Sequence, residues 1–429
     1  MPQAATLFFG QALIIVGAPY LLWRHLGLRS VVPLVVVQIL CGMMLGPSGL
    51  GALAPDIWRA VFPPQSVAAL SGLASLAVVL FSFLSGLHLD FLELRRSGPG
   101  LALVGVGSIV VPATLGTLTG GVIAAAWPAE IGAGASVWQF SLAIGISLGI
   151  TALPVLAAIL RESGLLDSRA GSQALVCAAV NDGLLWLFLA LLIAALGRSD
   201  HSGAGGEPLA TLAMPVLSTL YLAVAVLVVR PLLARLLSPP PDGRPLGEAG
   251  TVLVVGTVAA SSFAAELIGL HYVIGGFAAG AVMPAAARRA IAERLETVTV
   301  VVLLPFFFVL TGLKTSFSAG SFAALAGIFA IATAATMLGK MIGTALPARW
   351  MGESWPHALT LGAMMQSKGL MEVVVLTVLL DAGVLTPTGF TALVLMALVT
   401  TAATKPLLYL TGAVRRGSGR AAAAVPARP

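Results

Sequence analysis

Asn181 and Asp182 are the residues of this sequence best suited to chemistry, because they are adjacent polar residues inside an apolar segment. The segment runs from residue 175 to residue 196, and Asp182 is the one carboxylate in it. At the centre of a membrane-spanning helix such a charge costs about 3 kcal/mol even on the lenient insertion scale. It is therefore rare unless it faces a cavity, an ion or a partner. The pair indicates a functional site at the depth of a membrane.

The composition indicates that the segments around this pair lie in a membrane. The sequence is 58% hydrophobic and only 9% charged, whereas soluble domains carry about 25% charged residues. Apolar runs of about 20 residues recur along the whole chain, and each can cross about 30 Å of hydrocarbon as a helix. The runs lack the period of two that a membrane barrel requires. We therefore expect an all-α polytopic membrane protein.

Thirteen membrane-spanning segments are expected from these runs. An outside amino terminus and a cytoplasmic carboxyl terminus place most arginines in cytoplasmic loops and span ends, as the positive-inside rule requires. The expected location is the inner cell membrane. The expected spans are approximately 5–23, 31–53, 66–91, 101–126, 136–160, 170–197, 209–237, 248–268, 270–285, 298–315, 321–348, 356–380 and 388–412.

The remaining charged and sulfur-containing residues exclude several other classes of protein. The net charge of +6 comes from basic residues in short loops, which orient membrane proteins, so a nucleic-acid partner is not expected. Cys41 and Cys177 lie in apolar segments at no metal-ligand spacing, and no cofactor is expected. No clustered carboxylates or histidines lie near span ends in the sequence, so an enzyme is not expected either.

One internal repeat is visible in the sequence. Residues 81–91 read FSFLSGLHLDF and residues 307–317 read FFVLTGLKTSF, with Ser85 opposite Thr311. In the expected topology the first copy ends a span on the cytoplasmic side, and the second ends one outside. Inverted repeats of this kind are common in secondary transporters.

Several stretches together resemble the monovalent cation:proton antiporter-2 family. They include VVPLVVVQILCGMMLGPSGLG at 31–51, ITALPVLAAILRESGLL at 150–166, AAVNDGLLW at 178–186 and MMQSKGLMEVVVL at 364–376. The resemblance covers nearly the whole chain, in the order of the family. The Asn-Asp pair and the GPSGLG ending are its most specific parts.

The resemblance implies a Na⁺/H⁺-antiporter-like fold in which two broken helices cross beside the ion site. In this sequence the matching breaks lie near Gly149–Thr151, before Pro154, and near Gln366–Gly369. Unwound backbone at membrane depth is tolerated only where it lines a cavity or is buried in protein, and its freed carbonyls can bind a cation. The breaks therefore mark where the ion site is expected.

The resemblance also assigns roles to single residues. The ion-binding, proton-carrying carboxylate falls on Asp182, with a monovalent cation bound there and Asn181 beside it. A carboxyl group shielded from water favours its neutral form and can release its proton when a cation arrives. Thr151 and Ser367 could offer hydroxyl groups to the cation, although such side chains also commonly bond the helix backbone.

The family's characteristic lysine falls on Lys340, which could tether Asp182 or Asn181 or act as a second competing charge. Lys368 and Glu372 lie one helical turn apart and are expected to neutralise each other across the break. The family's ion-binding aspartate is often preceded by a second aspartate in electrogenic relatives. Asn181 at that position favours one-for-one exchange.

The expected organisation is an exchanger domain over residues 1–412 followed by a short basic cytoplasmic tail at 413–429. Within the domain we expect a core bundle at 66–197 and 298–412 and a dimerisation part at 1–65 and 209–285, giving a homodimer. The leading hypothesis is a secondary active antiporter of Na⁺ or K⁺ and H⁺ in a lipid bilayer. The alternatives are a channel-like potassium efflux protein and a sodium-coupled organic solute transporter on the same fold.

Overall fold

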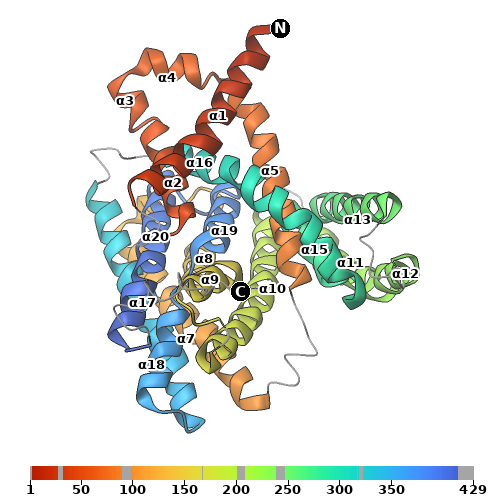
Figure 1. Cartoon of the computed structure of the whole chain (residues 1–429), viewed down its shortest axis with the longest axis vertical. Coiled ribbons are helices and arrows are strands. Elements are labelled where there is room, and N and C mark those ends of the chain that lie inside the picture. Colours follow the sequence, from red (N-terminus) through yellow and green to blue (C-terminus); the bar gives the residue numbers. More distant parts are fainter. Residues whose placement is uncertain are drawn as a thin grey trace, which may run out of the picture.

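The chain folds into a bundle of helices in a computed structural model that describes residues 2–27, 32–88, 98–166, 168–200, 208–237, 247–315, 317 and 322–413 (Figure 1). Over these residues the chain forms no strand, and a single bridge joins Ile131 to Leu385. The expected all-α class is thus confirmed. Of the expected basic tail at 413–429, residues 414–429 lie outside the described residues.

The helices follow the apolar runs of the sequence closely. Their bounds are α1 (Pro2–His25), α2 (Leu34–Leu45), α3 (Leu50–Leu53), α4 (Pro55–Val61), α5 (Pro64–Leu87), α7 (Gly98–Ala126), η2 (Pro128–Glu130), α8 (Val137–Gly149), α9 (Leu153–Glu162), α10 (Arg169–Asp200), α11 (Pro208–Val224), η3 (Ala225–Val229), α12 (Arg230–Leu236), α13 (Glu248–Leu267), α14 (Tyr272–Ala281), α15 (Ala285–Thr297), η4 (Val298–Leu303), α16 (Leu304–Lys314), α17 (Phe322–Trp350), α18 (Trp355–Met364), α19 (Gly369–Asp381) and α20 (Pro387–Leu410).

Ten helical stretches among the described residues are long and apolar enough to cross a membrane. The other three expected spans correspond to helix pairs or shorter helices, namely α8 with α9, α14, and α18 with α19. The number of thirteen crossings therefore stays a prediction. The tenth expected span begins earlier than residue 298, because α15, η4 and α16 form one continuous helical stretch over Ala285–Lys314.

The helices pack in two groups. The first, which we call the crossing group, consists of α7, α8, α9, α10, α17, α18, α19 and α20. The second, the frame group, consists of α1, α2, α5, α13, α14, α15 and α16 (Figure 1). The expected core boundaries at residues 66 and 298 differ from this packing, since α5 and α16 pack mainly with the frame group. The division into core and dimerisation parts stays a prediction.

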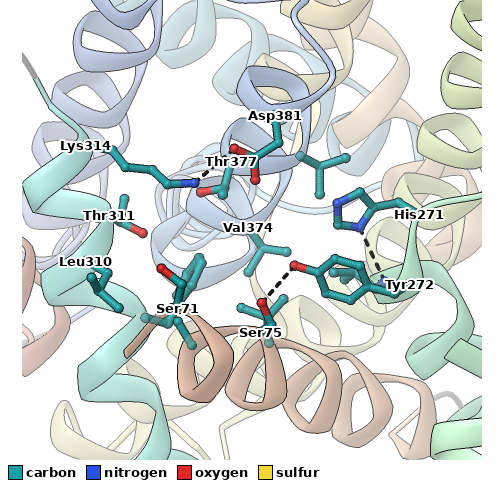
Figure 2. A pocket seen from close by; sticks show the side chains of 15 residues that line it. Ser71, Ser75, His271, Tyr272, Leu310, Thr311, Lys314, Val374, Thr377 and Asp381 are labelled. Carbon is teal, nitrogen blue, oxygen red and sulfur yellow. Dashed lines mark hydrogen bonds and ion pairs between the residues drawn. The ribbon is translucent and has the colours of Figure 1, made fainter. Parts of the chain in front are cut away.

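Among the described residues, the side-chain contacts that join the two groups include one aromatic stack and two polar contacts. Trp186 of α10 stacks on Phe277 of α14 with ring centroids 5.0 Å apart. Ser85 of α5 hydrogen-bonds to Asp182 of α10. Lys314 at the end of α16 forms an ion pair with Asp381 at the end of α19 (Figure 2).

The two copies of the sequence repeat make the same kind of helix contact. Gly86 of α5 lies against α14, where a Cβ atom added to Gly280 would come within 2.0 Å of the Phe83 carbonyl oxygen. Gly312 of α16 lies against α2, where a Cβ added to Gly42 would come within 2.2 Å of the Val309 carbonyl oxygen. Both contacts bring helix backbones together at a distance that only glycine permits. Each copy of the repeat therefore supplies a glycine at which two helices pack closely.

Candidate functional site

The site is built on two breaks that face each other. The first separates α8 from α9 at residues 150–152, and the second separates α18 from α19 at residues 365–368. The Ala152 amide donates to the Ser367 carbonyl at 2.8 Å, and the Thr151 hydroxyl donates to the Met365 carbonyl at 2.9 Å. The two unwound segments are therefore hydrogen-bonded to each other, as the expected crossing requires.

Local sequence explains where each break falls. Pro154 occupies the first turn of α9, a position that proline favours because its missing N–H would be unpaired there anyway. Gly369 begins α19 with φ of +51°, in the left-handed region that glycine adopts without steric cost. A Cβ atom at Gly369 would also lie 2.7 Å from the Val155 side chain. Proline thus lies in the first turn of the half-helix after the first break, and glycine begins the half-helix after the second break.

Asp182 lies fully inside the protein beside the first break. Its side chain is 2% exposed, and Oδ2 accepts a hydrogen bond from the Ser85 hydroxyl at 3.2 Å. The carboxylate also faces the Leu153 amide at the start of α9, where the helix dipole favours negative charge. Oδ1 has no hydrogen-bond partner among the described residues. Because buried polar atoms are almost always paired, this oxygen is available to accept a proton or to bind a cation.

Asn181, the preceding residue of α10, has a second buried oxygen that is free. The residue is 0% exposed, and its Nδ2 donates to the Ser108 hydroxyl of α7 at 3.0 Å. That bond orients the amide and leaves Oδ1 without a partner among the described residues. An uncharged carbonyl oxygen beside a carboxylate is the ligand type that hard cations select.

Lys340 of α17 is held at the carboxyl end of α8. Its Nζ donates to the Gly149 carbonyl at 2.5 Å, to the Thr151 hydroxyl at 2.6 Å and to the Ser108 carbonyl at 2.9 Å. An ammonium group has three donors, so these contacts use all of them. The direct tether to Asp182 or Asn181 that the sequence left open is not among the described contacts.

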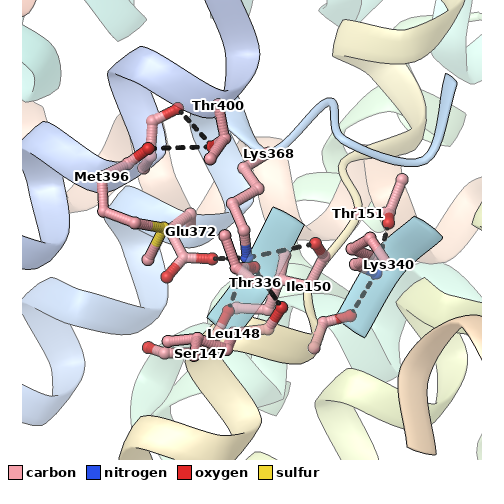
Figure 3. Close-up of polar contacts among 12 residues, drawn as sticks. Ser147, Leu148, Ile150, Thr151, Thr336, Lys340, Lys368, Glu372, Met396 and Thr400 are labelled. Atoms are coloured by element: carbon pink, nitrogen blue, oxygen red, sulfur yellow. Dashed lines mark hydrogen bonds and ion pairs between the residues drawn. The ribbon is translucent and has the colours of Figure 1, made fainter. Parts of the chain in front are cut away.

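Lys368 fills the same end of α8 from the other break (Figure 3). Its Nζ lies 3.1 Å from Glu372 Oε2, and both side chains are 0% exposed. It also donates to the Ser147 carbonyl at 2.9 Å and the Leu148 carbonyl at 3.0 Å. The expected pairing of Lys368 with Glu372 therefore forms. Together the two lysines satisfy carbonyl groups that the end of α8 leaves unpaired.

The other predicted site residues take structural bonds. The Ser367 hydroxyl donates to the Met364 carbonyl at 3.0 Å, and Gln366 Nε2 donates to the Met337 carbonyl at 3.0 Å. Thr151 uses its proton on Met365 and accepts from Lys340, which leaves one lone pair.

Sequence reasoning missed several polar residues that contact the site, and three of them bond residues already named. They are Ser85, Ser108 and Thr401, and the Thr401 hydroxyl accepts from the Gly369 amide at 2.9 Å. The repeat draws attention to Ser85, because this hydroxyl lies opposite Thr311. Ser108 and Thr401 carry no signal of their own, since lone hydroxyl groups are frequent in apolar helices.

Half-helices that cross at a buried carboxylate define a membrane transporter of ions or small solutes. A family model described as "Sodium/hydrogen exchanger, transmembrane" matches residues 12–409. The chain therefore belongs to the sodium/hydrogen exchanger transmembrane family, and the resemblance to monovalent cation:proton antiporters is confirmed.

Individual relatives agree with this assignment. Na(+)/H(+) antiporter NhaS4 of Synechocystis is 31% identical over 94% of this chain and 96% of its own length. Cation/H(+) antiporter 19 of Arabidopsis thaliana is 35% identical over 88% of this chain and 46% of its own length. K(+)/H(+) antiporter 1 of Saccharomyces cerevisiae is 29% identical over 94% of this chain and 46% of its own length. The chain thus spans about half the length of the plant and yeast relatives.

A solved structure shares the fold. The sodium proton antiporter MjNhaP1 from Methanocaldococcus jannaschii aligns with a TM-score of 0.62 over 95% of this chain and 97% of its own, at 13% identity. The Na⁺/H⁺-antiporter-like fold is thereby confirmed.

Proposed function

We propose that the protein is a secondary active antiporter that exchanges a monovalent cation, Na⁺ or K⁺, for H⁺. The observation that carries the proposal is that two buried oxygens of adjacent residues, Asp182 Oδ1 and Asn181 Oδ1, have no hydrogen-bond partner among the described residues. A proton on Asp182 removes the negative charge that a cation needs. A bound cation in turn disfavours protonation of the same carboxylate. Exchange requires at least that Asp182 hold either a proton or a cation, and never both.

The surrounding residues act by positioning this carboxylate. Ser85 fixes one carboxylate oxygen, and Asn181 is fixed through Ser108. Lys340 and Lys368 bind the oxygens at the end of α8, so the unwound backbone keeps its shape whichever ion is bound. The free oxygens of Asp182 and Asn181 are thereby left for the ion or the proton.

Alternating access follows from the two packing groups. We propose that the crossing group moves against the frame group and exposes Asp182 to each side in turn. The contacts that join the groups, including Trp186 with Phe277, would then be remade during each cycle. We further propose a homodimer in the inner cell membrane, with the amino terminus outside and the carboxyl terminus in the cytoplasm.

The test is exchange in everted vesicles or proteoliposomes that contain a pH-sensitive dye. Addition of Na⁺ or K⁺ to acidified everted vesicles should reverse the quenching of the dye, and the variant Asp182→Asn should give no response. A conductive efflux protein would instead move K⁺ without moving protons. Absence of proton movement with every alkali cation would overturn the proposal.

A further inference from the structure

A second polar cluster lies away from Asp182, between the two packing groups. It lines a pocket of about 70 Å³ between α5, the start of α14, α16 and α19. Figure 2 shows Lys314, Asp381, Thr377, Thr311 and Tyr272 around this space, which we call the α16–α19 pocket. The expected topology places it on the outer side of the membrane. None of these residues takes part in the site at Asp182 described above.

The pocket already holds a positive charge against a carboxylate. Lys314 Nζ lies 2.9 Å from Asp381 Oδ1, and the two side chains are 43% and 46% exposed. An ion pair exposed to this extent contributes little to stability. The ammonium can therefore leave the carboxylate for water at little cost. Lys314 acts here as a tethered monovalent cation.

The hydroxyl group of a largely buried residue is open to the same pocket and available to a ligand. Thr311 is 2% exposed and lines the pocket, and no hydrogen bond of its hydroxyl is found among the described residues. It occupies the position in the repeat that Ser85 occupies in the other copy. Ser85 donates to the carboxylate of Asp182, whereas Thr311 stands beside a space that Asp381 also lines (Figure 2). The two copies thus each bring a hydroxyl group to an acidic site.

The chemistry of the lining selects the class of ligand. Asp381 is the carboxylate of the pocket, and Thr377 and Thr311 add hydroxyl oxygens. Among the described residues no group of three His, Cys, Asp or Glu side chains could hold a metal ion. One negative charge with neutral oxygens matches a monovalent cation better than a divalent one, which prefers several carboxylates.

We propose that the α16–α19 pocket is a second monovalent cation site, at which an arriving cation replaces the Lys314 ammonium on Asp381. Replacement breaks the ion pair between α16 and α19 and so removes one contact between the frame and crossing groups. Cation arrival on this side would thereby favour separation of the groups there. This last step rests on the proposed exchange function, whereas binding at Asp381 does not.

The test measures cation binding in the background of Asp182→Asn, which lacks the carboxylate of the first site. Melting temperature is followed in detergent as NaCl or KCl replaces N-methylglucamine chloride at constant ionic strength. We expect Na⁺ or K⁺ to raise the melting temperature, and Lys314→Gln to shift this rise to lower cation concentration. The shift should be about fivefold or more, the factor by which one unit charge 4 Å away changes local cation concentration even in bulk water.

Further variants separate this site from general salt effects. Asp381→Asn should abolish the cation-dependent rise, and Thr311→Val should weaken it. Arg289→Gln is the matched control, because it removes one positive charge from an exposed ion pair on α15, and it should change nothing. Equal cation dependence with and without Asp381, or none in Lys314→Gln, would overturn the proposal. The proposed exchange is tested separately by the vesicle assay with Asp182 intact.

Discussion

Asn181 and Lys340 are linked through a single residue, Ser108. The hydroxyl of Ser108 accepts from Asn181 at 3.0 Å, and its backbone carbonyl accepts from Lys340 at 2.9 Å. Lys340 therefore contacts the surroundings of Asp182 through α7 and the first break, and a direct bond to the carboxylate is not among the described contacts. In the proposed exchange, this relationship separates the residues that position the site from Asp182, which would bind the ion.

Asp182→Asn should abolish exchange and leave the protein folded. Asparagine keeps the size of the side chain and can still accept a hydrogen bond from Ser85, but it removes the charge for which cation and proton compete. The melting temperature should be unchanged or higher, because an isolated buried charge is costly. Vesicle exchange and melting temperature are measured on the same preparations. Retained exchange would show that another residue carries the proton.

Lys340→Ala should lower the stability of the folded protein. It leaves the Ser108 and Gly149 carbonyls and the Thr151 hydroxyl without their donor. Each buried acceptor that loses its partner costs about 1–3 kcal/mol, so the melting temperature should fall clearly. Lys405→Ala is the control, because that lysine forms a partly exposed ion pair with Glu162. An unchanged melting temperature with lost exchange would assign Lys340 to coupling instead.

The Lys368–Glu372 pair should behave as one unit. Lys368→Met or Glu372→Met alone leaves an unpaired charge with 0% exposure and should cost about 3–5 kcal/mol. The double variant should recover much of the loss, because neither charge is then left without a partner. Melting temperatures of all four proteins complete a double-mutant cycle. Additive losses would mean that the two residues act independently.

Exchange should be electroneutral. Lys340 donates to three oxygens, a set that a neutral amine with two N–H groups could not fill, so this lysine should keep its proton throughout the cycle. Asp182 then carries one monovalent cation in exchange for one proton. The rate in proteoliposomes should be the same with and without a potassium diffusion potential set by valinomycin, tested with Na⁺ as substrate. A rate that follows the imposed potential would indicate a second titrating group.

The breaks were predictable because their signals are local. Pro154 and the Gln-Ser-Lys-Gly stretch lie within a few residues of the structural breaks at 150–152 and 365–368. Asp182 was found in the same way, as a charge in an apolar run. These features depend on the chemistry of neighbouring residues and need no knowledge of the packing.

The partners of the site were not predictable from the sequence. Ser85 lies 97 residues from Asp182 in the chain, and Ser108 lies 232 residues from Lys340. Such contacts depend on how helices pack, and the polar end of a lysine can reach several neighbouring helices. Residues 285–297 were missed as the start of a spanning helix for a different reason. These residues include several charged side chains, so the sequence shows no long apolar run in α15.

The hydrogen bond from the Ala152 amide to the Ser367 carbonyl has a consequence for how ion preference can change. It joins backbone to backbone, so only a proline at residue 152 would remove its donor. A substitution at Ser367 therefore leaves this bond in place, and a substitution at Thr151 removes only the second bond between the segments, from the Thr151 hydroxyl to the Met365 carbonyl. A lineage of such proteins could alter which cation it carries while the scaffold of the crossing stays the same.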